Sequence, residues 1–109
     1  MTTPEVILKQ QVMDYLLRLP NSYFWQNDSF GLKGRKRKTK YRPNGVPDVL
    51  GCVDGQFIGI ELKIGKNKLS EDQIIFCSRL TECGGKYYTV RDIHDIQELA
   101  KINGWIDGT

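Results

Sequence analysis

The chain has 109 residues, of which 39% are hydrophobic and 27% are charged, and its formal net charge is +3. This length suits one domain, residues 1–109, with a single core, and the composition excludes wholesale disorder. The positive charge is concentrated, because seven basic residues and no acids lie between Lys33 and Arg42, which leaves nine basic against thirteen acidic residues elsewhere. We therefore expect one local basic patch on a mildly acidic body.

No apolar run is long enough to cross a bilayer, and the amino terminus lacks the pattern of a secretory signal. The three cysteines form no C-x-x-C pair and lie in apolar segments, so we interpret them as reduced core residues. These features predict a cytoplasmic protein. His94 is the only histidine, so carboxylates must supply the ligands of any metal site.

The first predicted element is a helix that begins at Thr3-Pro4-Glu5, where a capping residue, a proline and an acid follow one another. It should run to about Leu19, and its apolar stripe, read back from Leu8, places Glu5 on the inward-facing side. Residues 23–27 are typical of a strand, and the basic, glycine-containing segment after them is typical of a long loop.

Two strands are predicted next, over residues 47–53 and 56–63, and Asp54-Gly55 between them is typical of a tight hairpin turn. Ser70-Glu71-Asp72-Gln73 has the form of a capping box, so a helix should follow and reach Cys83. A strand over residues 86–90 and a helix from Asp92 to about Asn103 complete the set. The predicted class is α/β, with the order αβββαβ followed by a C-terminal helix.

The hairpin turn fixes which residues face each other across the two strands, and it brings Asp48 opposite Glu61. Directly opposed acids, with β-carbons about 5 Å apart, destabilise a sheet unless something compensates, and a divalent cation is one such compensation. Lys63 projects from the same face as Glu61. The alternative is that these are strand-end acids with a surface lysine. The register, with Pro47 opening the strand directly before Asp48, favours a functional trio.

Two further candidates also have complete structural explanations. Glu5 would stabilise the positive end of the first helix dipole, although its place on the inward-facing stripe favours a ligand role. Gln73 is accounted for by the capping box, and the sequence leaves its functional use open.

Taken together, these residues resemble the PD-(D/E)XK nuclease superfamily, specifically its virus-type replication-repair nuclease (VRR-NUC) branch. The resemblance involves nearly the whole chain, and its motifs occur in order on the expected helix, strand, strand and helix. The matching stretches are Glu5, Gly45-Val46-Pro47-Asp48, Ile60-Glu61-Leu62-Lys63, Ile64-Gly65 with Leu69-Ser70, and Gln73. It implies a restriction-endonuclease-like core, a mixed sheet flanked by helices, that hydrolyses phosphodiester bonds with Mg²⁺, or with Mn²⁺ as a substitute.

The resemblance also implies roles for these residues. Asp48 and Glu61 would be the principal metal ligands, joined by the backbone carbonyl of Leu62 and, directly or through water, by Glu5. Lys63 would orient or deprotonate the attacking water, or neutralise charge on the phosphate, and Gln73 would orient Lys63 or the water. Short stand-alone members of phage or bacterial type are expected to act as homodimers on branched DNA, in the manner of Holliday junction resolvases.

The basic segment is predicted to contact DNA phosphates, with Tyr41 able to stack on an exposed base. Its alternative role is that of a solvated surface loop. The residues concerned are Lys33, Arg35, Lys36, Arg37, Lys38, Lys40, Tyr41 and Arg42. Two other functions stay open: a flap, nick or single-strand nuclease of phage replication or repair, and a DNA-binding module that keeps the fold without cleaving.

Overall fold

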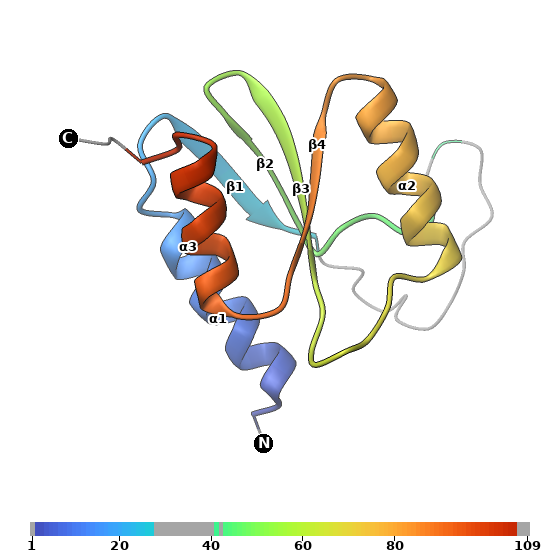
Figure 1. Ribbon diagram of the computed structural model, residues 1–109, viewed down its shortest axis with the longest axis horizontal. Coiled ribbons are helices and arrows are strands. Elements are labelled where there is room, and N and C mark those ends of the chain that lie inside the picture. Colours follow the sequence, from blue (N-terminus) through green and yellow to red (C-terminus); the bar gives the residue numbers. More distant parts are fainter. Residues whose placement is uncertain (1, 28–40, 42, 107–109) are drawn as a thin grey trace.

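A computed structural model of the chain describes residues 2–27, 41 and 43–106. Its elements are α1 (Pro4–Leu16), β1 (Ser22–Gln26), β2 (Val49–Val53), β3 (Gln56–Leu62), α2 (Glu71–Glu82), β4 (Lys86–Val90) and α3 (Ile93–Ile102). One sheet forms the centre, with α1 and α3 on one side of it and α2 on the other (Figure 1). The predicted element order and α/β class are confirmed.

The four strands lie side by side in the order β1-β2-β3-β4. The pairs β1–β2 and β2–β3 are antiparallel and β3–β4 is parallel, which makes the sheet mixed as expected. In the hairpin, Val53 pairs with Gln56 and Val49 pairs with Ile60. The turn residues Asp54 and Gly55 have φ values of 50° and 83°, as a tight two-residue hairpin requires. The predicted register is therefore confirmed.

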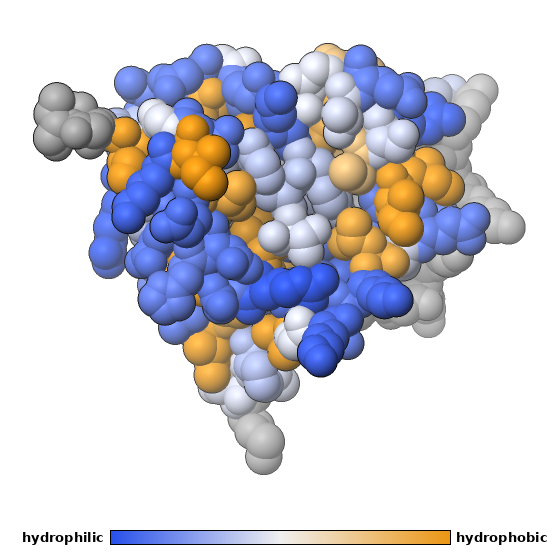
Figure 2. Space-filling model, in the orientation of Figure 1, coloured by the Kyte–Doolittle hydropathy of each residue, from blue (hydrophilic) through white to orange (hydrophobic). Residues whose placement is uncertain are grey.

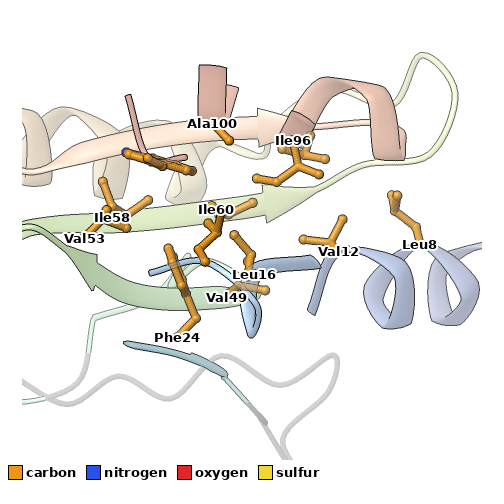
Figure 3. Packing of buried hydrophobic residues seen from close by; sticks show 13 residues of the cluster. Leu8, Val12, Leu16, Phe24, Val49, Val53, Ile58, Ile60, Ile96 and Ala100 are labelled. Atoms are coloured by element: carbon orange, nitrogen blue, oxygen red, sulfur yellow. The ribbon is translucent and has the colours of Figure 1, made fainter. Parts of the chain in front are cut away.

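The core fills the space between the sheet and the two helices α1 and α3. Val49, Ile58 and Ile60 are fully buried there, and Figure 3 shows them beside the stripe of α1 and the inner side of α3. Burial of such a side chain contributes about 1.5–3 kcal/mol. Because side chains alternate along a strand, Asp48 and Glu61, each next to a core residue, project from the opposite face, the one that α2 covers.

Some boundaries differ from the sequence-based expectation. α1 ends at Leu16 rather than Leu19, because the amides of Arg18 and Leu19 donate to carbonyls three residues back, at 3.2 and 3.1 Å, which closes the helix in a tighter turn. β2 begins at Val49, since Pro47 has no N–H for the ladder. The interpretation of the cysteines as core residues is wrong: Cys83 is exposed at the end of α2, and Cys52 and Cys77 are only half-buried and lie outside the buried core.

The segment before β2 is wedged between α2 and the sheet. Gly45 has a φ of +74°, and a Cβ added there would lie 2.3 Å from the carbonyl oxygen of Asp72 at the start of α2. A Cβ at Gly59 would lie 2.9 Å from Pro47 and 3.4 Å from Leu80. Two glycines thus make room for the segment that carries Asp48.

α2 lies at the surface of the protein, and none of its residues is buried. In Figure 2 hydrophilic residues dominate the surface over α1 and α3, whereas hydrophobic residues gather over α2, where Ile74 and Ile75 are about half exposed. Within the described ranges, no helix is long and apolar enough to pass through a membrane.

We expect Gly45→Ala to destabilise the protein more than Gly55→Ala. Both glycines have positive φ, for which a side chain costs about 1–2 kcal/mol, but only Gly45 has backbone atoms where the new Cβ would lie, whereas Gly55 has none within 4 Å. The clash should add at least about 1 kcal/mol. Urea unfolding of the two variants measures the difference, and equal losses would show that close packing at Gly45 does not hold the segment.

Candidate active site

Asp48 bridges the two strands of the hairpin. Its backbone carbonyl accepts a hydrogen bond from Asn27 at 2.7 Å, which ties it to the end of β1. Its carboxylate oxygen Oδ2 accepts a hydrogen bond from the backbone N–H of Leu62 on β3 at 2.8 Å. The side chain is therefore held across the open end of the hairpin, beside Glu61.

Glu61 is the only buried charged residue in the described part of the chain, with 4% of its surface exposed. It shares a hydrogen bond with the Asp48 side chain, whereas its other oxygen, Oε1, is buried without a partner. Burial, the hydrogen bond with Asp48 and the negative charge of Asp48 together raise the pKa of Glu61 to about 8. Near neutral pH the Glu61 carboxyl group of the metal-free protein therefore keeps its proton and donates a hydrogen bond to Asp48.

Lys63 completes the trio that the hairpin register predicted. Its backbone N–H donates to the carbonyl of Val90 on β4 at 3.0 Å, which fixes the chain just beyond β3. The half-buried side chain lies near enough to Glu61 for its positive charge to lower the pKa of that carboxyl group, against the larger effects of burial and Asp48. Asp48, Glu61 and Lys63 thus come together at one end of the sheet.

Gln73 forms the predicted capping box at the start of α2. Its side-chain oxygen accepts from the backbone N–H of Ser70 at 2.8 Å, and its own N–H donates to the Ser70 hydroxyl at 3.2 Å. The cap places Gln73 next to Gly45, since a Cβ at Gly45 would lie 2.7 Å from the Gln73 nitrogen. A catalytic role of Gln73 stays a prediction.

Glu5 is exposed in the first turn of α1, although the rest of its stripe is buried. Among the described residues, no three His, Cys, Asp or Glu side chains form a group that could hold a metal ion. Glu5 is therefore not assembled with Asp48 and Glu61 as a three-carboxylate set. Its role as a ligand stays a prediction.

Most of the predicted DNA-binding residues lie outside the described residues, namely Lys33, Arg35, Lys36, Arg37, Lys38, Lys40 and Arg42. Tyr41 is described and is 79% exposed, so its ring is accessible.

Tyr87 is a residue near the pair to which sequence reasoning gave no role. It lies on β4 opposite Gly59 of β3, on the same sheet face as Glu61. Its hydroxyl group is buried without a hydrogen-bond partner. The hairpin turn specifies the pairing of β2 with β3, but no short turn joins β3 to β4, so the sequence contained no signal for this neighbour.

The residues at this position suit a small, hard divalent cation. Mg²⁺ prefers oxygen ligands and keeps several waters, so two carboxylates and a carbonyl are an adequate set. The unpaired oxygen of Glu61 is a buried acceptor that a cation would satisfy. Metal binding also displaces protons from its ligands, and the proton shared by Asp48 and Glu61 is the one it would displace.

A comparison with solved structures found a protein of the same fold. A structure described as a VRR_NUC domain superposes with a TM-score of 0.69 at 18% sequence identity, covering 92% of this chain and 97% of the other. The fold expected from the sequence resemblance is therefore confirmed. Neither protein-family models nor curated proteins gave a match to the sequence.

We predict that the metal-free protein loses stability as the pH rises from about 5 to about 8. The pKa of Glu61 is about 8 in the folded chain, against an ordinary value of 4.5. Between these two pH values the folded chain binds more protons than the unfolded chain, so the free energy of unfolding falls as the pH rises. Urea unfolding in the presence of a chelator measures this slope. Glu61→Gln should flatten it, because an amide does not titrate there, and an equally steep slope in that variant would refute the shared proton.

Proposed function

We propose that this chain is a metal-dependent, structure-selective DNA endonuclease of the VRR-NUC type that resolves Holliday junctions. The observation that carries the proposal is Glu61, a carboxyl group buried against Asp48 with one oxygen unpaired. Such a group is costly to a fold that uses it only structurally. The VRR_NUC-like fold supports the same conclusion.

Asp48, Glu61 and the carbonyl of Leu62 would hold Mg²⁺, with Mn²⁺ as a substitute and Glu5 acting through water. When bound, the ion would make a water more acidic and polarise the phosphoryl oxygen. Glu61 would have to release its proton to act as a ligand. Beside the ion, Lys63 would orient or deprotonate the attacking water, or neutralise charge that develops on the phosphate.

Gln73 would act on Lys63 or on the water. Because its side-chain oxygen is used by the capping box, the amide nitrogen is the group that it would use. Its position at the start of α2, beside the segment that carries Asp48, supports this role.

The proposed substrate is branched DNA in the cytoplasm of a bacterium or a phage-infected host cell. The basic segment between Lys33 and Arg42 would neutralise backbone phosphates, and the exposed ring of Tyr41 would stack on a base. Resolution of a junction requires two symmetric cuts, so the active form would be a homodimer with two active sites related by a two-fold axis.

A flap, nick or single-strand nuclease is the second candidate, because the same site would serve it. A non-cleaving DNA-binding module is disfavoured by the presence of Asp48, Glu61 and Lys63 together at one end of the sheet. One assay separates these functions: four-way junctions, flaps, nicked duplexes, single strands and linear duplexes are compared in Mg²⁺ and again with a chelator. Paired cuts across the junction, abolished by the chelator, would support resolution.

Asp48→Asn and Lys63→Ala should each abolish junction cleavage while leaving folding and junction binding intact. The first removes a metal ligand and the second removes the charge beside it. Lys66→Ala is the matched control, because Lys66 is an exposed lysine just outside the trio, and it should cleave normally. Full cleavage by either site variant would refute the assignment.

Replacement of Lys36, Arg37 and Lys38 by alanine should flatten the salt dependence of DNA binding. The slope of log affinity against log salt concentration falls by about one unit for each lost phosphate contact. Lys101→Ala, an exposed lysine on α3, serves as the control and should leave the slope unchanged. An unchanged slope in the triple variant would remove the basic segment from the interface.

A further inference from the structure

Two buried side-chain oxygens lack a hydrogen-bond partner in the described part of the chain, and they belong to Glu61 and Tyr87. The register of β3 and β4 pairs Gly59 with Tyr87 and Glu61 with Thr89. Tyr87 and Glu61 therefore project from the same face of neighbouring strands, because Tyr87 lies beside Gly59, two residues before Glu61 on β3. An unpaired buried hydroxyl or carboxylate oxygen is unfavourable, so two of them in one region indicate a shared missing partner.

The environment of Tyr87 defines its hydroxyl as a hydrogen-bond donor. Its ring packs against Phe76 of α2, with ring centroids 6.4 Å apart, which holds the side chain under the helix. Burial, followed by the negative charge of Glu61, raises the pKa of Tyr87 above its ordinary value, and Cys77 and Asp48 add to the effect. The hydroxyl thus keeps its proton, and it lies within reach of the charges of Glu61 and Asp48 on the same face of the sheet.

We infer that Tyr87 is a positioning residue for the carboxylate pair: its hydroxyl donates to a water molecule that also binds Oε1 of Glu61. The two oxygens are not bonded to each other directly, and a single water between them would satisfy both. Hydrogen-bonded partners of this kind orient metal-binding carboxylates. Tyr87 would therefore hold Glu61 in the orientation of a metal ligand, an inference that rests on the proposed metal-dependent function.

The test is the affinity for Mn²⁺ alone, measured by calorimetry without DNA. Tyr87→Phe keeps the ring that packs against Phe76 and removes only the hydroxyl, so the variant should fold. We expect its Mn²⁺ affinity to fall by about 10- to 100-fold, the usual effect of losing an outer partner of a ligand. Its metal-free stability should fall slightly, because the water bound to Oε1 of Glu61 loses the hydroxyl that donates to it.

Tyr88→Phe is the matched control. Tyr88 is the next residue of β4, faces the other side of the sheet, and its hydroxyl donates to Asn103 at 3.1 Å. This variant should lose metal-free stability but bind Mn²⁺ like the wild type. Thermal unfolding gives a second readout, because the rise in Tm on adding Mn²⁺ reports the affinity, and this rise should shrink only in Tyr87→Phe.

The outcomes separate the inference from the function on which it rests. Wild-type protein that fails to bind Mn²⁺ would overturn the proposed metal site and this inference with it. Binding by the wild type and an equal affinity in Tyr87→Phe would overturn the inference alone. An equal loss of affinity in both tyrosine variants would also overturn it, because the effect would then come from the strand and not from this hydroxyl.

Discussion

The interaction on which this structure depends is the contact between two carboxyl groups, Asp48 and Glu61, at the open end of one hairpin. Glu61 is almost fully buried. Two negative charges in contact in a low-dielectric environment are strongly unfavourable. A shared proton makes the contact tolerable in the metal-free protein, and under the proposed function a bound cation would do so. The same burial that makes the pair unfavourable gives Glu61 a pKa near the pH at which an enzyme works.

The rest of the fold keeps that contact in place. The apolar residues Val49 and Ile60 face the core beneath α1 and α3, and their burial fixes which residues turn to the other side. A shift of one residue would exchange the two faces and bring the acids into the core. On the far side, Gly45 and Gly59 allow the segment before β2 to lie close to α2 and to the sheet. Packing on both faces therefore determines the geometry of the acid pair.

Local patterns were enough to predict the element order, the hairpin register and the trio at its end. Asp54-Gly55 specifies a turn with one pairing, and that pairing alone places Asp48 opposite Glu61. Helical periodicity placed Glu5 on the inward-facing stripe, but Glu5 is exposed in the first turn of α1, whereas Leu8 one turn later is buried. Periodicity gives the direction of a side chain, not the extent of the surface that covers it.

Features that depend on distant contacts were not accessible from the sequence. The position of Tyr87 beside the acid pair follows from the parallel pairing of β3 with β4, and no local turn determines that register. The close approach of Pro47 to Gly59 depends in the same way on how α2 lies over the sheet. The roles that the family resemblance assigns to Gln73 and the basic segment require DNA to be tested.

The most direct measurement for the central claim is the number of protons released when Mg²⁺ or Mn²⁺ binds, obtained from calorimetry in two buffers with different ionisation enthalpies. At about pH 7, below the pKa of about 8 for Glu61, the acid pair holds its proton, so binding should release about one proton in the wild type. The number should fall to near zero in Glu61→Gln. Metal binding without proton release from the wild-type protein would contradict the account.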